Sequence, residues 1–476
     1  MPSVHVTAIE TSDDTRTEHD LLGERAVPAD AYWGVHTLRA VENFPITGTT
    51  IGQYPDLIAA LAWVKQAAAA ANAELGLLDE ARATAIIDAC KEIRAGRWHD
   101  QFVVDPIQGG AGTSTNMNAN EVIANRALEL LGRRRGDYAF LHPNEHVNRC
   151  QSTNDVYPTA VRLALIAAAQ RLGVAMSGLR DAFAEKAIEF DDIMKIGRTQ
   201  LQDAVPMTLG QEFATYGVML SEDIDRLAEA TALLHEINLG ATAIGTGITA
   251  PATYAPLACA HLAHLSGRPL ISAPDLIEAT QDVGAFVQLS GVLKRIAVKL
   301  SKTCNDLRLL SSGPQAGFGE LLLPPVQAGS SIMPGKVNPV IPEVVNQIAF
   351  EVIGHDLTVT MAAEGGQLQL NAFEPVLFRA LMESLTHLRA GCETLTDRCV
   401  RGIRADRELL RLRVAGSMAI VTALTPAIGY EAATIIAREA QRTGTSVAEL
   451  ALAGGLLTPA QLALILRPET LTRPTA

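Results

Sequence analysis

Residues 157–190 read YPTAVRLALIAAAQRLGVAMSGLRDAFAEKAIEF, and this stretch decides the fold class. Its apolar side chains recur at helical spacing almost without a break, and Pro158 falls in a first turn, where proline is tolerated. At ~1.5 Å per residue the stretch predicts a helix of about 50 Å. Comparable helices are expected at about 208–237, 280–310, 342–362 and 374–400. Five long helices with short connections predict a mainly all-α protein with a central bundle, whose exposed apolar faces need partner subunits.

Composition narrows the class of protein. The chain has 476 residues, of which 48% are hydrophobic and only 4% aromatic, and this balance favours helices over sheets. A formal net charge of −13 and a pI near 5.4 argue against a nucleic-acid surface. The N-terminal residues lack the apolar core of a signal peptide. The sequence contains no window of ~18 uninterrupted apolar residues that could span a membrane, so no membrane partner is expected. We therefore expect a cytoplasmic protein.

Cysteine and glycine spacing give no sign of a cofactor. The six cysteines show no CxxC pair, so they are expected to be reduced and mostly buried. The segment HPNEH at 142–146 lacks metal-ligand spacing, and no metal is expected. The glycines of 238–251 are not followed by Gly-Lys-Ser/Thr, which excludes a phosphate-binding loop of that type.

The remaining segments complete the expected organisation. Residues 1–18 are polar and expected to be frayed, and residues 21–43 mix Gly, Pro and aromatics without a period, which predicts irregular structure. Shorter helices are expected at 55–75, 78–95, 121–131, 417–425, 429–443, 446–453 and 458–466, followed by a disordered tail. Three parts are predicted: an N-terminal domain (1–150), the central bundle (151–403) and a small C-terminal helical domain (404–476).

Two polar stretches precede expected helices. Residues 108–120 read QGGAGTSTNMNAN, and Ser152, Thr153 and Asn154 stand just ahead of the first long helix. Hydroxyl, amide and backbone donors at a helix start can hold a carboxylate, although for residues 108–120 taken alone an N-cap with nothing bound is the better interpretation. A third stretch, GRTQLQDAVP at 197–206, links the first two long helices.

The fourth polar stretch is GSSIMPGKVNPVIPEVVNQ at 329–347. Its two glycines and three prolines exclude a regular helix over its first half. It continues a loop that starts near Ser311, and a loop of ~20 residues in a compact protein is usually a functional lid or disordered. Lys336 and Asn338 come just before the next helix, where donors are well placed to hold an anion.

These stretches resemble the aspartase/fumarase superfamily, whose signature GSSxMPxKxNP is present at 329–339. The resemblance covers roughly residues 20–464. It implies a three-domain fold with a central bundle of five long helices. It also implies homotetramers with a twenty-helix core and active sites built from three subunits. Phrases such as QGGAGTSTNMNANEV, QSTNDVYPT and MPGKVNPVIPEVVNQ are most similar to the aspartate ammonia-lyase branch, which implies reversible deamination of L-aspartate to fumarate and ammonia through an aci-carboxylate.

The resemblance also assigns roles, which the residues alone do not. It makes Ser330 the catalytic base, whereas the sequence itself does not separate Ser330 from Ser331. The substrate-binding residues that it implies are Thr113, Ser152, Thr153 and Ser331 for the β-carboxylate, Lys336 and Asn338 for the α-carboxylate, and Asn154, Thr199, Gln200 and Ile332 around the rest of the substrate. Arg198 and Asp203 are expected to pair structurally.

Neighbouring functions in the superfamily fit much of the same pattern. Class II fumarases carry histidine after the Thr of GRTH, where this chain has Gln200. Because some aspartases also have histidine there, Gln200 counts against a fumarase more than it proves an aspartase. Another fumarate-releasing lyase and a catalytically silent structural protein of the same fold also stay open. The silent protein would be marked by damage at Ser330, Lys336 or Thr199, and all three are intact.

Overall fold

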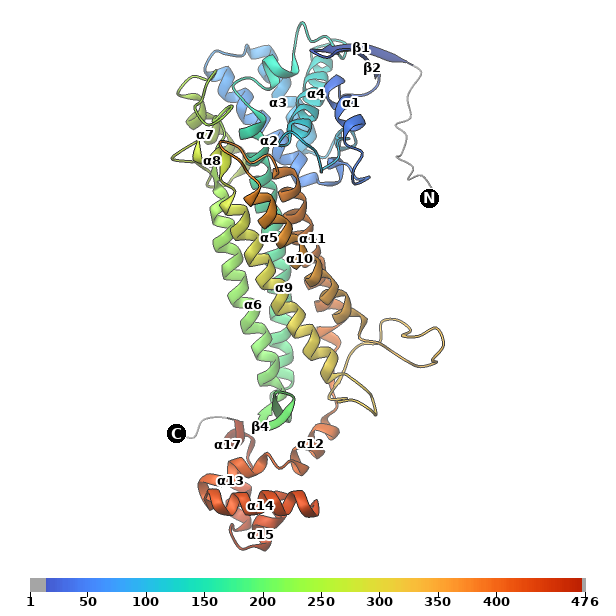
Figure 1. The fold of residues 1–476 in the computed structure, drawn as a ribbon, viewed down its shortest axis with the longest axis vertical. Helices are drawn as coiled ribbons and strands as arrows, with labels where there is room; N and C mark the ends of the chain where they lie inside the picture. Colours follow the sequence, from blue (N-terminus) through green and yellow to red (C-terminus); the bar gives the residue numbers. More distant parts are fainter. Residues whose placement is uncertain (1–13, 473–476) are drawn as a thin grey trace. The chain divides into compact units, whose positions relative to one another are not determined.

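The computed structural model describes residues 14–472 and is mainly helical (Figure 1), which confirms the predicted fold class. All five long helices are present, with ends within a few residues of those expected. They are α5 (Thr153–Glu189), α6 (Leu209–Ala232), α9 (Gly284–Leu310), α10 (Val340–Glu364) and α11 (Glu374–Arg398).

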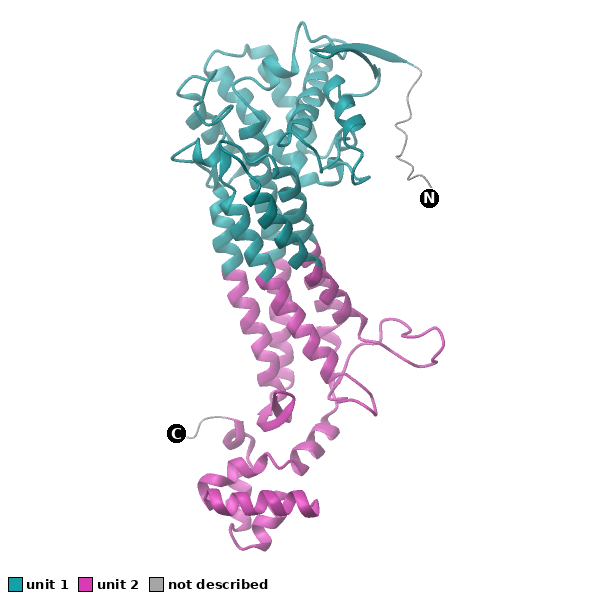
Figure 2. Ribbon diagram, viewed as in Figure 1, with its two compact units in different colours: residues 1–172, 226–294, 351–386 teal, residues 173–225, 295–350, 387–476 magenta. Residues whose placement is uncertain are grey.

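The chain clusters into two compact units, each assembled from three stretches (Figure 2). Unit 1 holds residues 1–172, 226–294 and 351–386, and unit 2 holds residues 173–225, 295–350 and 387–476. Every long helix contributes a segment to both units. The division into three domains near residues 150 and 403 remains a prediction.

Unit 1 surrounds its long-helix segments with shorter elements. These are β1 (Thr15–Asp20), β2 (Gly23–Pro28), α1 (Val35–Asn43), α2 (Pro55–Glu74), α3 (Glu80–Arg94), α4 (Thr113–Leu130), α7 (Tyr254–Ser266), α8 (Glu278–Gln281) and the short parallel pair β5 (Glu236–Ile237) and β6 (Ile271–Ser272). Helix α2 packs against α3 and α7, and its alanine-rich surface is buried on nearly every side. Such all-round burial is typical of a helix inside a core.

The expectation of frayed and irregular structure before residue 43 is wrong within the described residues. Strands β1 and β2 form an antiparallel hairpin, and α1 is a regular helix. The hairpin is polar, so it lacks the alternation that reveals a strand in a sequence. Arg16 holds it instead, by an ion pair with Glu18 and by donating to the carbonyls of Ala31 and Trp33 at 2.7 Å each. Residues 1–13 lie outside the described residues.

Two buried carboxylates secure the start of α1. Glu18 accepts from the N–H of Val35, and Glu121 accepts from the N–H groups of Gly34, His36 and Thr37 at 2.8 to 3.1 Å. Gly34 leaves room for both, since a Cβ there would stand 2.4 Å from a Glu18 oxygen. The acceptors that cap this helix come from residues distant in the sequence, so the local sequence pattern did not predict the helix.

Helix α4 begins at Thr113, eight residues earlier than expected. Its first turns carry asparagines that disfavour helix interiors locally but are satisfied by tertiary partners. Asn118, for example, accepts from the N–H of Val103 at 2.9 Å and donates to the carbonyl of Gln101 at 3.0 Å. The polar stretch at 113–120 is therefore part of the helix and not a loop before it.

Unit 2 contains two small sheets and a C-terminal group of short helices. They are β3 (Met194–Thr199) paired with β4 (Gln202–Thr208), β7 (Leu321–Leu322) paired with β8 (Arg404–Ala405), and α12 (Arg407–Gly416), α13 (Ile420–Ile428), α14 (Tyr430–Thr443), α15 (Val447–Ala453), α16 (Pro459–Ile465) and α17 (Pro468–Thr472). The C-terminal helices share a core that includes Leu424, Ile436 and Ala451. The tail was expected to be disordered, but α17 occupies its first half and Gln211 donates to the carbonyl of Thr472 at 2.9 Å.

The first half of helix α5 is apolar and buried on nearly every side, whereas Arg171, Asp181 and Glu185 are exposed further along it. Among residues 14–472 it is the only single helix with the length and hydropathy of a membrane span, and 72% of that apolar window is buried within the protein. A second span would require the bent pair α12 and α13 to count as one. This degree of burial fits a core helix.

Aromatic side chains pack α5 against α6 within unit 2. The ring of Phe213 lies 5.1 Å from that of Phe190, 5.8 Å from that of Tyr216 and 6.1 Å from that of Phe183. Phe213 is fully buried, so these contacts replace water on every side of its ring.

We expect Phe213→Ala to lower the free energy of unfolding by about 3–5 kcal/mol, because it leaves a cavity among three rings. Denaturant unfolding followed by circular dichroism measures the change. Val218→Ala, at a position 59% exposed on the same helix, is the control and should change stability little. Equal losses in the two variants would contradict the role given to the aromatic cluster.

Candidate active site

The predicted site residues fall on the two units, in four turns or helix starts. Thr113, Ser152, Thr153 and Asn154 belong to unit 1, and Thr199, Gln200, Ser330, Ser331, Ile332, Lys336 and Asn338 belong to unit 2. Within unit 1 the structure brings the starts of α4 and α5 together, because Asn116 donates to the Thr153 hydroxyl oxygen at 3.1 Å.

Thr113 opens α4 after an unusual turn. Gly110, Ala111 and Gly112 have φ values of 88°, 55° and 89°, all in the left-handed region that favours glycine. Gly112 also lies against the ring of Tyr157, which an added Cβ would approach to 2.5 Å. The half-buried Thr113 donates its hydroxyl to the carbonyl of Gly110 at 2.7 Å.

Asp155 fixes the backbone around Ser152 and Thr153. This fully buried carboxylate accepts from the N–H of Ser152 at 3.0 Å, and from the N–H groups of Gly240 and Thr242 at 3.1 and 2.9 Å. Burial raises the pKa of Asp155 to about 6, although the three N–H donors and a nearby lysine favour its charged form. The 238–251 segment therefore holds the start of α5 in place, and we call this contact the brace.

Asn154 is held by the same brace. Its Nδ2 donates to the carbonyl of Ala243 at 2.7 Å, while its own carbonyl accepts from Nδ2 of Asn238 at 3.0 Å. The second contact replaces the helical hydrogen bond that Pro158 does not donate. Helix α5 consequently starts at Thr153, four residues before the predicted start, and Asn154 keeps its Oδ1 as an acceptor.

Thr199 and Gln200 are exposed at the turn between β3 and β4. Gln200 and Leu201 have φ values of 54° and 61°, so both central residues of this tight turn are left-handed without being glycine. Such conformations cost of order 1–3 kcal/mol and persist where the surroundings enforce them, often at functional sites.

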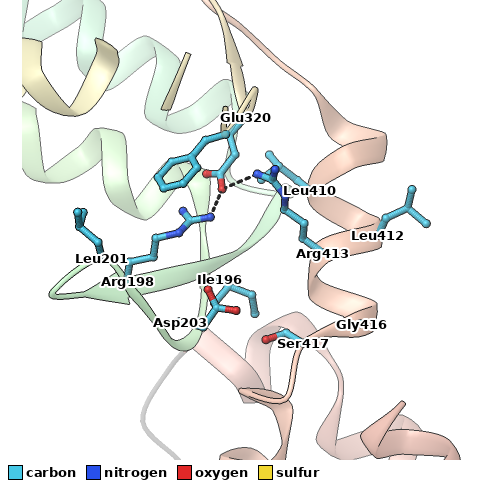
Figure 3. Close-up of a pocket in the computed structure, with 11 residues that line it drawn as sticks. Ile196, Arg198, Leu201, Asp203, Glu320, Leu410, Leu412, Arg413, Gly416 and Ser417 are labelled. Carbon is cyan, nitrogen blue, oxygen red and sulfur yellow. Dashed lines mark hydrogen bonds and ion pairs between the residues drawn. The ribbon is translucent and has the colours of Figure 1, made fainter. Parts of the chain in front are cut away.

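A cluster of charges around one buried carboxylate lies against this hairpin (Figure 3). Glu320, 1% exposed, pairs with Arg198 and lies 3.1 Å from both Lys195 and Arg413. Burial by itself raises the pKa of Glu320, but the hydrogen bond from Arg198 and the charge of Lys195 outweigh it and lower that pKa. The carboxylate thus stays ionised at neutral pH.

The ion pair with Glu320 corrects the prediction that Arg198 pairs with Asp203. The two residues face each other across the β3–β4 ladder, but the ion pair of Arg198 is with Glu320, from the segment after α9. A cavity of about 440 Å³ lies beside the cluster (Figure 3). Its walls are Ile196, Arg198, Leu201, Asp203, Phe318, Glu320, Leu410, Leu412, Arg413, Gly416 and Ser417.

Residues 329–338 form a small closed loop. The N–H of Gly329 donates to the carbonyl of Lys336 at 2.8 Å, and Nδ2 of Asn338 donates to the carbonyl of Gly329 at 2.6 Å. Only glycine fits at 329, because a Cβ would stand 2.7 Å from the Lys336 carbonyl oxygen. Ser331, Ile332 and Lys336 are exposed on this loop.

The Ser330 hydroxyl has a distinctive environment within this loop. Its Oγ accepts from the backbone N–H groups of Ile332 at 3.2 Å and Met333 at 3.0 Å. Two N–H donors aimed at one oxygen favour its anionic form.

The residues that hold these turns were missed by the sequence analysis. They are Lys65, Asn116, Asn148, Asp155 and Glu320. A lone lysine in the apolar run AWVKQAAAA is a signal that could have pointed to Lys65. Among residues 14–472 no group of three or more His, Cys, Asp and Glu side chains is placed to hold a metal ion, and all six cysteines are free and buried.

Comparisons with known proteins agree with this architecture. The model of the Lyase family matches residues 23–354, and that of the fumarase C C-terminus matches residues 420–473. Aspartate ammonia-lyases of Helicobacter pylori J99 and Escherichia coli K12 are 56% and 54% identical, each over 97% of this chain and 98% and 97% of their own. That of Pseudomonas aeruginosa is 58% identical over 97% of both chains.

Solved structures give the same result. The fumarate lyase:delta crystallin of Brucella melitensis, bound to cobalt, is 55% identical with a TM-score of 0.95, covering 97% of this chain and 100% of its own. The class II fumarase of Schistosoma mansoni is 34% identical with a TM-score of 0.91, covering 96% and 98%. With more than half of its length matched by the Lyase family and its fold shared along nearly the whole chain, the protein belongs to the aspartase/fumarase superfamily of lyases.

Proposed function

We propose that the protein is a carbon–nitrogen lyase that reversibly deaminates L-aspartate to fumarate and ammonia. The observation that carries this proposal is the 54–58% identity to aspartate ammonia-lyases over nearly the whole chain, with the site motifs intact. We expect it to act in the cytoplasm, without a metal or organic cofactor.

The difficult step is removal of a proton from C3 of aspartate, beside a carboxylate that is already charged. The product is a doubly charged aci-carboxylate, which preorganised donors stabilise, each worth ~3–4 kcal/mol. Thr113, Ser152, Thr153 and Ser331 are the proposed donors to this β-carboxylate. The starts of α4 and α5 support this assignment because Asp155 and the left-handed turn hold their backbones in place.

Ser330 is the proposed base. A free serine is a poor base, so its alkoxide needs stabilisation before it can take the C3 proton. The N–H groups of Ile332 and Met333 on its Oγ supply part of this. Lys336, in the same closed loop, is proposed to supply a cation. Closure of the loop over substrate would exclude water and strengthen both effects.

The leaving group then departs as neutral ammonia. The electron pair of the broken C3–H bond forms the C2–C3 double bond, and the C–N pair leaves with nitrogen, so no proton donor is needed. Asn154, Thr199 and Gln200 are proposed to orient the ammonium group by accepting from it. Lys336 and Asn338 would hold the α-carboxylate, and the 84% exposed Ile332 would cover the bound substrate.

The proposed assembly is a homotetramer whose sites are shared by three subunits. Most of the proposed β-carboxylate donors lie in unit 1, and the base lies in unit 2. Helix α10 exposes Ile353, Leu357 and Met361 along one face at helical spacing, by 38%, 63% and 62%. An apolar stripe of this kind is typical of a subunit interface.

Purified protein should release fumarate from L-aspartate, which ultraviolet absorbance detects, and should release none from malate. Ser330→Ala should lower kcat by at least ~10³-fold with the tetramer intact, because no base remains. Ser312→Ala, in the same long loop, serves as the control. Turnover of malate instead of aspartate would favour a fumarase, and full activity of Ser330→Ala would refute the assigned base.

Mixing two inactive variants tests the shared sites. If Ser330 and Thr153 of one site come from different subunits, co-refolding Ser330→Ala with Thr153→Val in equal amounts should restore roughly a quarter of wild-type activity. Each variant refolded alone is the control. Failure of the mixed tetramers to regain activity would place both groups on the same subunit.

Glu320→Gln should loosen the turn that carries Thr199 and Gln200, because three cations lose their shared buried carboxylate. Breaking such a buried pair costs about 3–5 kcal/mol, measurable by denaturant unfolding, and kcat for aspartate should fall as well. Glu408→Gln, at an exposed pair with Arg411, is the control. If stability falls but kcat is unchanged, the charge cluster stabilises the fold without contributing to the reaction.

A further inference from the structure

Lys65 is a buried cation that the reaction as described does not use. It lies on α2, is 0% exposed, and donates from Nζ to Oδ1 of Asn148 at 2.8 Å and to Oε1 of Gln151 at 2.9 Å. Gln151 immediately precedes the proposed carboxylate donors at Ser152 and Thr153. A lysine is rarely this deep in a core unless its charge is paired, and both hydrogen-bond partners of Lys65 are neutral amides.

A chain of hydrogen bonds connects Lys65 to Thr153, and it has a direction. Lysine is a donor to Asn148, which turns the Oδ1 of that side chain toward Lys65. The same Oδ1 then accepts from Nδ2 of Asn116 at 3.2 Å, and that Nδ2 also donates to Oγ1 of Thr153 at 3.1 Å. Because the Thr153 oxygen accepts here, its own hydrogen is left to donate elsewhere.

The arrangement leaves two buried acceptors without a partner. Oδ1 of Asn116 and Oδ1 of Asn120 both lie in the interior with no hydrogen bond, while Nδ2 of Asn120 donates to Asn148 at 3.2 Å. Both oxygens follow from the direction of the chain, because each amide turns its Nδ2 toward the Oδ1 of Asn148. Other buried acceptors, such as Oδ1 of Asn72 and of Asn238, also have no hydrogen bond, so the direction of the chain and not the unpartnered oxygens carries the argument.

We propose that Lys65 is a positioning residue for the reaction: it fixes the direction of the Asn148–Asn116–Thr153 chain, so that the Thr153 hydroxyl donates to the substrate β-carboxylate. The ammonium also places a positive charge behind the donors that receive the developing negative charge. This inference rests on the proposed function, which supplies the dicarboxylate substrate.

The charge on Lys65 gives the proposal a measurable signature. Burial lowers the pKa of Lys65 to about 7, while the charge of Asp155 on α5 raises it; the other titratable group that faces Lys65 is Cys90 on α3. Burial raises the pKa of Cys90 to about 12, so this thiol is neutral. A bound dianion favours protonated Lys65, so binding should take up protons above pH 7 and should weaken as the pH rises.

The test uses succinate, which has both carboxylates of the substrate but no amino group. Lys65→Met removes the charge and both hydrogen bonds at similar volume, and Asn116→Asp removes the Nδ2 donor with little change of shape. Each should raise the Kd of succinate and the KM of aspartate about tenfold or more. Lys91→Met, at a lysine 59% exposed on α3, is the matched control and should leave both unchanged.

Two readouts separate positioning from a merely structural role. Calorimetry of succinate binding in buffers of different ionisation enthalpy should show proton uptake by the wild type between pH 7 and 8, and none by Lys65→Met. In a Thr153→Val background, Lys65→Met should raise the Kd by a clearly smaller factor than it does in the wild type, because the part of its effect that passes through that hydroxyl is already lost.

The outcomes are distinct. Wild-type protein that takes up no proton, wild-type affinity in Lys65→Met, or fully additive losses with Thr153→Val would each overturn the role of Lys65. The first outcome needs only the wild type, so it tests the role even if both variants prove hard to fold. If any of these results is found while the wild type turns over aspartate normally, the role of Lys65 is refuted and the proposed function is not. A wild type that neither turns over aspartate nor binds succinate would instead refute the function itself.

Discussion

A charge buried among helices must be met by an opposite charge or by several donors or acceptors, and this requirement holds the turns that carry the candidate site. Asp155 draws in three backbone N–H groups around the start of α5. Glu320 gathers Lys195, Arg198 and Arg413 around the β3–β4 hairpin. Lys65 donates hydrogen bonds to the side chains of Asn148 and Gln151 in the segment just before α5. An apolar replacement could pack as well, but it would leave these backbones without a fixed position.

Held turns and an exposed loop have complementary roles in the proposed reaction. Donors that receive charge in a transition state contribute most when they do not have to reorganise, and the braced starts of α4 and α5 meet that condition. A serine alkoxide, by contrast, is best formed only once water is excluded. Placing Ser330 on an exposed loop closed at its neck by Gly329 and Asn338 allows its environment to change while its local hydrogen bonds persist.

The sequence was sufficient where local patterns carry the information. The five long helices follow from their apolar period, and the motif residues follow from family resemblance. The sequence analysis failed where residues distant in the sequence determine the local structure. The β1–β2 hairpin depends on Arg16 bonding to carbonyls up to 17 residues away, and α1 depends on Glu121 from another helix. Lys65 and Glu320 act through contacts across 83 to 122 residues, so no local pattern reveals their partners. The roles of the site residues remain predictions.

The direction of hydrogen bonds matters as much as their number in a site for a dianion. The chain as a whole carries a formal charge of −13, so attraction of a dicarboxylate has to be local. A threonine hydroxyl can either donate or accept, and a carboxylate can only accept. A network that starts at a pure donor such as Lys65 therefore orients each amide in turn until the last hydroxyl donates. The unpartnered oxygens of Asn116 and Asn120 are consistent with that orientation, since each amide directs its Nδ2 to the Oδ1 of Asn148.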